Sequence, residues 1–517
     1  MTSNPTVSNL GGVPDGLKKK LLWASFLTLI AAGIGFAVRG GILGDWSSQF
    51  GFTMLELGTI TGGGLVGFGV VILLTSLITD RIGYKSILIL AGVLQIASYV
   101  LTVAAGPIYA SMGKDATYQC LYWGMFMFSV SCGLCECVIN PLVATLYPDK
   151  KTHYLNILHA GWPAGLVLGA LIGIVMGGQM GLGWQVQLSM FLIPVIWYFI
   201  LTITSPFPKS EASAAGIGFG EMLLTLASPV LLLLLFLHAC VGYVELGTDS
   251  WISNITNNIT GGQGLYLFMY ASIMMFILRF FAGPIVERIN PLGLLLVSAA
   301  LGCIGLYFLG SVQGVVMVWV AVTIYSLGKT FLWPTMLGVV GERFPKGGAI
   351  AMGALGGVGM LSAGLLGGPG IGYKQDYFAS QQLKEANSAT YERYSAASEN
   401  GFLVFPAVKG LDGSKVGVLL DDGKSLAGEV EVLKKGNAYD NDKNIKPLND
   451  WWQTAQATKA DDKAPVEKAR LHGGQTALRY TAIIPGVMFI GYLILLLYFK
   501  SRGGYKPVVL GAGGKET

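Results

Sequence analysis

Long apolar runs separated by short polar connections make up most of this chain. A helix that crosses a bilayer needs about 20 mostly apolar residues, and twelve runs of roughly that kind can be marked. They cover residues 21–45, 57–79, 86–106, 119–146, 154–178, 185–205, 229–251, 264–286, 292–310, 314–340, 348–372 and 479–500. The pattern predicts an all-α polytopic membrane protein with twelve transmembrane helices.

One long polar stretch interrupts the apolar pattern between the eleventh and twelfth runs. Residues 374–479 hold fifteen Lys or Arg and fifteen Asp or Glu, so the remainder carries the whole net charge of +5. Residues 374–398 and 461–478 are predicted helical, and "GFLVFPAVKG", "KVGVLL" and "GEVEVL" are predicted as short strands. We expect a small α+β lobe at residues 373–478, capping the outer end of the helix bundle.

Composition supports the membrane assignment. The chain is 53% hydrophobic and only 12% charged, about half the charged fraction of a typical soluble domain. Lys and Arg gather in the connections on one side of the predicted membrane and after the last run, which predicts that this side is cytoplasmic. We therefore expect a multi-pass protein of the cell inner membrane with both termini in the cytoplasm.

These predictions divide the chain into seven parts. They are a cytoplasmic tail (1–20), an N-terminal six-helix half (21–205), a cytoplasmic linker (206–228), helices 7–11 of a C-terminal half (229–372), the extracytoplasmic lobe (373–478), helix 12 (479–500) and a second cytoplasmic tail (501–517).

The two halves repeat one another. "SLITDRIGYK" joins runs 2 and 3, and "GPIVERINPLG" joins runs 8 and 9. Glu136 in run 4 stands five residues before Pro141, as Lys329 in run 10 stands five before Pro334. The sequence thus predicts two six-helix pseudo-repeats, an arrangement that usually binds its solute near the midplane where the halves meet.

The paired acidic–basic turns resemble the signature of the major facilitator superfamily. That resemblance implies an alternating-access transporter with a conformational gate on the cytoplasmic side. The residues that match the signature and would form the gate are Asp80, Arg81, Gly83, Gly283, Glu287 and Arg288.

Runs 4 and 5 resemble a narrower family. "GLCECVINPLVATLYP" and the following "HYLNILHAGWPAGLVLG" are similar to the fucose–proton symporters, in which a Glu precedes Asn-Pro in span 4. The first run departs from that family: where its members carry an Asn-Asp pair, this chain has Gly40, Gly41 and Ile42. The resemblance implies a secondary active transporter that moves a sugar or similar small polar solute, with protons as the coupled ion.

Charged residues inside the apolar runs are candidate functional residues. A charge at the centre of a membrane helix costs about 2.5–3.5 kcal/mol on insertion scales, so it usually faces a cavity or a partner. By the repeat, Arg39 corresponds to Glu245 and Glu136 to Lys329. Two arrangements stay open: pairs within each half (Arg39–Glu136 and Glu245–Lys329), or a Glu136–Lys329 gate across the halves.

Glu136 is the preferred proton- or substrate-binding carboxylate, with a purely structural ion pair as the alternative. The candidate solute ligands are Asn140, His159, Trp162, Tyr243 and Trp333, because amides bind sugar hydroxyls and aromatic rings pack on sugar C–H faces; helix packing explains each of them equally well. Arg279 is predicted to be a framework residue.

Small residues carry two further predictions. Gly161, Gly165, Gly169 and Gly173 recur every four residues in run 5, and Gly356, Gly364 and Gly368 show nearly the same spacing in run 11. This spacing allows close helix contact. We expect smooth contacts between the halves, with static helix packing as the alternative. Cys132 and Cys135 form C-x-x-C, but without a second ligand set they are predicted to pack and not to bind metal.

Several functions are excluded or disfavoured. There is no G-x-x-x-x-G-K-[ST] motif and no nucleophile or metal constellation, so we expect neither an enzyme nor a bound cofactor, and the near-neutral lobe gives no sign of nucleic-acid binding. The expected partners of a monomer are a small polar solute, protons and the lipid bilayer. An organic-anion transporter of the same fold and a non-transporting solute sensor remain as alternatives.

Overall fold

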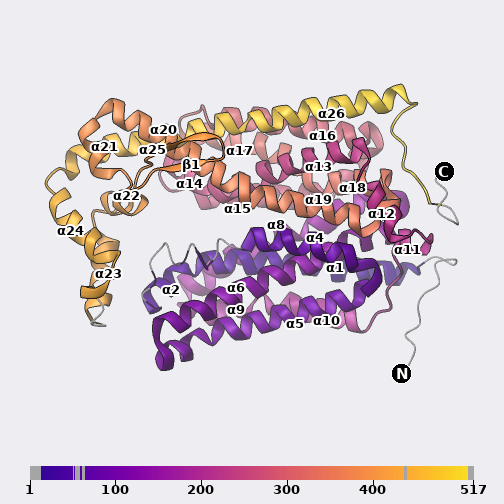
Figure 1. Cartoon of the computed structure of the whole chain (residues 1–517), viewed down its shortest axis with the longest axis horizontal. Helices are drawn as coiled ribbons and strands as arrows, with labels where there is room; N and C mark the ends of the chain where they lie inside the picture. Colours follow the sequence, from indigo (N-terminus) through magenta and orange to yellow (C-terminus); the bar gives the residue numbers. More distant parts are fainter. Residues whose placement is uncertain are drawn as a thin grey trace.

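The computed structural model describes residues 13–50, 52, 57, 59–60, 64–435 and 439–510. Figure 1 shows a bundle of long helices in two layers, the N-terminal half in indigo to magenta and the C-terminal half in pink to yellow. A smaller lobe projects from one end of the bundle.

The N-terminal layer is built from helices that follow the predicted runs. They are α1 (Asp15–Gly41), α2 (Leu43–Phe50), α4 (Gly64–Ile82), α5 (Tyr84–Val103), α6 (Ala105–Leu146), α7 (Lys151–His159), α8 (Gly161–Ile172), α9 (Trp184–Ser189) and α10 (Leu192–Ile203). Part of the predicted span 57–79 lies outside the described residues.

The C-terminal layer begins after a linker that contains α11 (Glu211–Ala214) and α12 (Phe219–Thr225). Its helices are α13 (Pro229–Gly242), the π-helix η3 (Tyr243–Gly247), α14 (Thr248–Thr260), α15 (Gly264–Arg279), α16 (Ala282–Leu309), α17 (Val315–Lys329), α18 (Leu332–Arg343), α19 (Gly348–Ser362), the π-helix η5 (Ala363–Gly367) and α26 (Ile483–Ser501).

The helices have the length and composition of membrane spans. Among the described residues, ten helical segments are long and apolar enough to cross a bilayer, and Gly264–Arg279 is a shorter apolar helix. The polytopic membrane class is therefore confirmed, while the count of twelve stays a prediction.

The two ends of the bundle differ. The described part of the chain begins and ends at one end of the bundle, which we call the terminal end, and the lobe lies at the other, which we call the lobe end (Figure 1). The placement of both tails on the side opposite the lobe stays a prediction, because both tails lie partly outside the described residues. Which end faces the cytoplasm remains a prediction from the basic residues.

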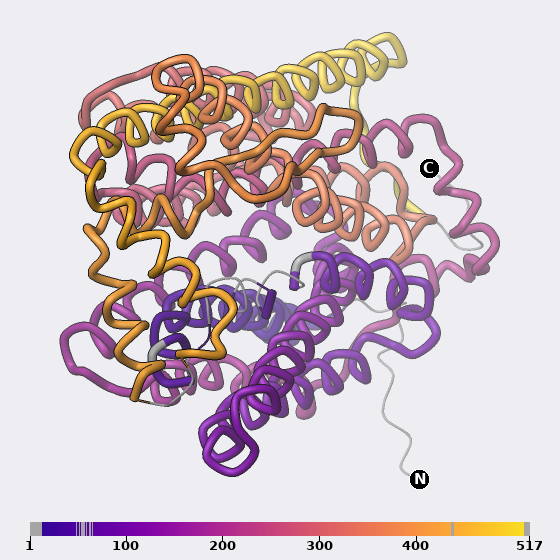
Figure 2. Tube along the Cα trace, turned by 60° about the vertical axis from the view of Figure 1, so that its left-hand side comes forward, coloured from indigo at the N-terminus to yellow at the C-terminus, as the bar shows by residue number. Residues whose placement is uncertain are grey.

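The lobe is mostly helical. It contains α20 (Gly368–Ala386), α21 (Ser388–Tyr394), an antiparallel hairpin of β1 (Asn400–Phe402) and β2 (Phe405–Val408), α22 (Gly413–Leu420), α23 (Lys424–Lys435), α24 (Ile445–Ala455) and α25 (Lys459–Thr481). The helix predicted over 461–478 is confirmed by α25. The helix predicted over 374–398 is confirmed in part, because α20 and α21 cover residues 374–386 and 388–394, with a break at Asn387 and no helix over 395–398. In Figures 1 and 2, α23 and α24 extend beyond the C-terminal layer towards the level of the N-terminal layer.

Two of the three predicted strands of the lobe are wrong. "KVGVLL" lies in α22 and "GEVEVL" in α23. The Asp412 carboxylate accepts hydrogen bonds from the backbone N–H groups of Ser414 and Lys415, which is the N-cap that starts α22. Short Val- and Leu-rich runs fit a buried helix as well as a strand, and here the cap decides.

The glycines of run 5 pack within one half. A Cβ on Gly165 would lie 2.5 Å from the Ile30 carbonyl oxygen of α1, and one on Gly169 would lie 2.6 Å from Ala37. The predicted role of these glycines between the halves is therefore wrong. On α19 the expectation is met, since a Cβ on the predicted Gly356 would lie 3.9 Å from Ile72 of α4 in the opposite half, and the neighbouring Gly353 and Gly357 approach α4 more closely.

Candidate functional site

A chain of buried polar side chains begins on α6. Glu136 and Asn140 lie one helical turn apart, and Asn140 Nδ2 donates to Glu136 Oε2 at 2.7 Å. Pro141 follows at once inside the helix and cannot supply a backbone N–H, which locally weakens the helix. Glu136 is only 7% exposed, and no cation lies within ion-pair distance of it among the described residues. Its direct hydrogen-bond partner is therefore a neutral amide, and the Arg279 guanidinium acts on it only from beyond ion-pair distance.

The chain continues to the next span. His159, the last residue of α7, places Nε2 at 2.9 Å from Asn140 Oδ1. An amide oxygen only accepts hydrogen bonds, so in this contact Nε2 carries the proton. Glu136, Asn140 and His159 thus form one connected unit, which we call the Glu136 triad. The sequence predicted all three as site residues and gave no reason for their connection.

Arg279 ties this unit to the C-terminal half. Its Nη1 donates to the His159 carbonyl oxygen at 2.6 Å, its Nε to the Thr330 carbonyl oxygen at 2.8 Å, and its Nη2 to Glu245 Oε1 at 3.0 Å. Because His159 belongs to the N-terminal half and Thr330 and Glu245 to the other, one fully buried guanidinium crosses the seam between the halves. Arg279 is a framework residue, as predicted, but its position at the seam was missed.

The predicted ion pairs within the halves are wrong. Glu245 pairs with Arg279, and Lys329 pairs with Asp249 of α14. The repeat correctly indicated that the C-terminal charges would be paired, but it could not indicate these partners. Arg279 has no counterpart in the repeat, and Asp249 lies one helical turn beyond Glu245.

Arg39 lies inside the N-terminal half, away from Glu136. It donates to Ser98 Oγ at 2.9 Å and to the Gly35 carbonyl oxygen, and its guanidinium lies 3.9 Å from the centre of the Phe128 ring. The side chain is 1% exposed. Arg39 therefore holds α1, α5 and α6 together and offers no free face to a solute.

The three predicted aromatic ligands are scattered. The Trp162 ring packs against Phe36 with centroids 5.6 Å apart, and Trp333 packs against His238 at 4.5 Å. Tyr243 lines a separate, largely apolar groove beneath the lobe. Among the described residues, none of these rings stacks on or hydrogen-bonds to the Glu136 triad, so their role as solute ligands stays a prediction.

The predicted gate residues lie at the terminal end, and both motif copies reach the opposite half. Asp80 faces Gly348, the first residue of α19, where the helix N-terminus favours a negative charge. In the second copy, the Gly283 N–H donates to His153 Nδ1 at 3.1 Å, and Glu287 lies 3.5 Å from Lys150. Both copies of the acidic–basic turn therefore contact the opposite half, through different groups.

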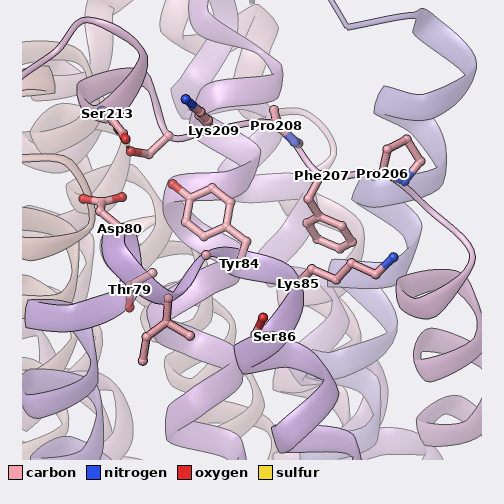
Figure 3. Close-up of a pocket in the computed structure, with 13 residues that line it drawn as sticks. Thr79, Asp80, Tyr84, Lys85, Ser86, Pro206, Phe207, Pro208, Lys209 and Ser213 are labelled. Carbon is pink, nitrogen blue, oxygen red and sulfur yellow. Dashed lines mark hydrogen bonds between the residues drawn. The ribbon is translucent and has the colours of Figure 1, made fainter. Parts of the chain in front are cut away.

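The linker covers the first motif copy. A cavity of about 240 Å³ separates the α4–α5 turn from residues 206–213, and Asp80 and Tyr84 point towards it (Figure 3). Arg81 lies over the Phe219 ring of the linker at 4.6 Å, and Gly83 takes φ +86° where α4 turns into α5. Arg288 is exposed.

Further contacts close the terminal end. Glu342 of α18 accepts from the Thr152 hydroxyl at 2.6 Å and from the Tyr505 hydroxyl at 2.7 Å. Lys151 bonds Glu211 of the linker at 2.6 Å and the Gly341 carbonyl oxygen at 2.9 Å. We call these contacts of Glu342 and Lys151 the terminal latch. Sequence reasoning missed it, although an acidic residue two positions after the predicted run 314–340 was the available signal.

The cysteines do not assemble a metal site. All six are free, and no group of three or more His, Cys, Asp or Glu able to hold a metal occurs in the described part of the chain. Cys132, Cys135 and Cys137 are buried in the helix packing of α6.

Comparison with known proteins identifies the family. The family model of the major facilitator superfamily matches residues 25–368, and the chain belongs to that superfamily. No curated protein sequence matches the chain.

Solved structures share the fold at low sequence identity. FucP, the fucose:proton symporter of E. coli, is similar in its outward conformation. It is 17% identical with a TM-score of 0.55, and the match covers 69% of this chain and 92% of FucP. The human organic anion transporter TETRAN is 14% identical with a TM-score of 0.57, covering 93% and 100%. A bacterial homologue of the human lysosomal transporter Spinster is 14% identical with a TM-score of 0.59, covering 96% and 100%. At these identities the likeness establishes the fold alone.

Proposed function

We propose that this protein is a proton-coupled symporter for a sugar or a similar neutral, polar solute, and that Glu136 is its proton-binding carboxylate. Membership of a transporter superfamily supplies the class of activity. The observation that carries the finer proposal is the buried Glu136 carboxylate, which has an amide neighbour and no ion-pair partner.

The physical reason is the cost of an isolated buried charge. A carboxylate removed from water without a cation takes up a proton far more readily than one in solution, whereas one held by a cation stays ionised. Glu245 has Arg279 within 3.0 Å, but Glu136 is hydrogen-bonded only to Asn140 within the described residues. Movement of the halves that changed the water access of Glu136 would change its proton affinity, and this would couple protons to alternating access.

A neutral solute is favoured over an anion by the state of the buried cations. Arg279 and Lys329 each have a carboxylate partner, and Arg39 is enclosed by α1, α5 and α6. None of the three is left to receive a substrate carboxylate. The structural likeness to a sugar symporter and to an organic anion transporter is of similar quality, so the anion transporter is the second candidate.

Alternating access requires contacts that open at one end of the bundle. The two motif copies and the terminal latch are the contacts between the halves that we assign to this role, with the terminal end as the cytoplasmic side. In this assignment the structure represents a state closed to the cytoplasm.

The test is uptake by purified protein in proteoliposomes. A panel of sugars and organic acids is presented with and without an inward proton gradient. The proposal predicts accumulation of at least one neutral sugar that rises with the gradient. Gradient-driven accumulation of an organic acid alone would favour the anion transporter, and binding without flux of any compound would favour a sensor.

A further inference from the structure

A groove beneath the lobe is unrelated to the Glu136 triad. It lies between α13, α20, the start of α26 and the β1–β2 hairpin, and it has a volume of about 810 Å³. Phe236, Ala239 and Cys240 line it from α13, Tyr243 from the start of η3, and Ile483 from α26. The groove is large enough for part of a lipid molecule.

The groove opens onto the outer, apolar surface of the bundle. Phe236 is 54% exposed and Ile483 is 57% exposed. The exposed apolar surface continues along α26 through Ile490, Ile494 and Leu497, a pattern expected of a helix that faces lipid. The groove is therefore continuous with the surface that the acyl chains of the bilayer cover.

One cation lies in this apolar groove. Lys374 Nζ donates to the Thr481 hydroxyl at 3.0 Å and lies 5.3 Å from the centre of the Tyr243 ring. No carboxylate lies within ion-pair distance of Lys374 among the described residues. An ammonium group in partly buried apolar surroundings without a counter-ion favours an anionic ligand.

The depth of Lys374 fits the phosphate layer of a membrane. The predicted run 348–372 ends two residues before Lys374, and the predicted run 479–500 begins beside its partner Thr481. Tyr373, Tyr377 and Tyr480 line the same groove, and tyrosines are enriched where hydrocarbon meets headgroups. Both runs thus place this amine at the membrane boundary.

The hairpin supplies the remaining wall. In its turn Leu403 is 73% exposed and Val404 is 94% exposed, and the next residue, Phe405, is 55% exposed. Three consecutive apolar residues at such exposure are unfavourable in water. The exposure of these residues is explained if the hairpin turn inserts into the bilayer beside the groove.

We propose that this groove is a binding site for one glycerophospholipid, with an acyl chain along α13 and α26 and the phosphate on the Lys374 ammonium. The bound lipid joins the lobe hairpin to helices of the C-terminal half. The lobe is thereby anchored to the membrane as well as to the chain.

The first test counts lipids retained by purified protein. Native mass spectrometry is applied to the protein purified with 1-palmitoyl-2-oleoyl-phosphatidylglycerol. Wild type retains one tightly held phospholipid, and Lys374→Gln lowers its occupancy about tenfold or more, because a hydrogen bond to a charged group contributes about 1.5–3 kcal/mol. Ala239→Phe fills the groove and lowers occupancy to a similar degree.

Matched substitutions control for the change in charge and size. Lys384→Gln alters an exposed lysine of the same helix α20, and Leu497→Phe enlarges an exposed residue of α26; both retain the wild-type occupancy. Wild-type occupancy in either Lys374→Gln or Ala239→Phe contradicts the proposal.

A second measurement uses unaltered protein and does not depend on a variant folding. Phosphatidylglycerol with a photoactivatable group in the middle of one acyl chain is reconstituted with wild type, and labelled peptides are mapped. Labelling concentrated in 236–243 and 402–406 supports the site. Labelling spread evenly along the exposed face of α26 overturns it.

Discussion

The two halves of this transporter treat their buried charges differently. In the C-terminal half, Arg279 pairs with Glu245 and Lys329 with Asp249. In the N-terminal half, Arg39 and Glu136 carry opposite charges but do not meet, and each is held by neutral groups. Protonation of Glu136 in the N-terminal half therefore breaks no ion pair. In the C-terminal half, each of these buried charges has a partner of opposite charge.

The contrast suggests a division of labour. Two buried charges that form an ion pair keep their protonation states, because neutralising one of them leaves the other buried without a partner. Such pairs serve as structural supports. An unmatched carboxylate exchanges its proton when its surroundings change. In the function that we propose, proton coupling therefore belongs to the N-terminal half.

The largest effect is expected at the residue that joins the halves. Arg279→Leu strands the buried Glu245 carboxylate and removes the bonds to the His159 and Thr330 carbonyl oxygens. We expect a loss of about 3–5 kcal/mol in the free energy of unfolding, measured by denaturant titration in detergent, and loss of uptake. Arg288→Leu, at an exposed arginine, is the control; equal stability of the two variants would contradict the bridging role.

A second pair of variants compares the loss of stability when one buried glutamate is neutralised in each half. Glu245→Gln leaves Arg279 without its counter-charge and is expected to cost about 3 kcal/mol. Glu136→Gln keeps a hydrogen-bonding oxygen for Asn140 and removes no ion pair, so it is expected to change stability by less than about 1 kcal/mol. Equal losses in the free energy of unfolding for the two variants would contradict the proposed difference between the halves.

A substitution in the terminal latch is expected to have a moderate effect on conformation. Glu342→Gln weakens the bonds from Thr152 and Tyr505 and should cost about 1.5–3 kcal/mol in the state closed at this end. The expected result is a larger population open at the terminal end, measured by spin-label distances between α7 and α18. Glu385→Gln, on the lobe, is the control, and an unchanged distance distribution for Glu342→Gln would exclude a gating role.

The smallest effect is expected for the unmatched arginine. Arg39→Met keeps much of the side-chain volume and removes a desolvated charge with no carboxylate partner, so stability should stay within about 1 kcal/mol or rise. Lys329→Met should instead lose about 3–5 kcal/mol, because Asp249 is left uncompensated. Thermal unfolding of the two variants is the measurement. A loss of stability in Arg39→Met as large as that in Lys329→Met would contradict this prediction.

Much of this fold was predictable because its constraints are local. Apolar runs of span length, the basic residues of the connections and the two copies of the acidic–basic turn indicated the membrane class and the family. Glu136, Asn140 and His159 were recognisable because polar residues are rare in such runs. Each of these signals is contained in a short stretch of sequence.

The partners of the buried charges were not predictable in the same way. Arg279 meets Glu245 and the His159 carbonyl because three helices cross at one point, and the spacing within any one helix does not encode that crossing. The lobe was misread for a related reason: short Val- and Leu-rich runs in 413–435 fit either secondary structure until the caps and packing are known. The glycines of run 5 correctly indicated close packing but not the helix that they pack against.

The most direct test of the central claim compares two modes of transport in Glu136→Gln. For the solute that the uptake panel identifies, proteoliposomes are assayed for accumulation driven by a proton gradient and for exchange of labelled against unlabelled solute without a gradient. If Glu136 carries the proton, the variant loses gradient-driven accumulation but keeps exchange, while Glu385→Gln keeps both. Full accumulation by Glu136→Gln with the pH dependence of wild type would contradict the account.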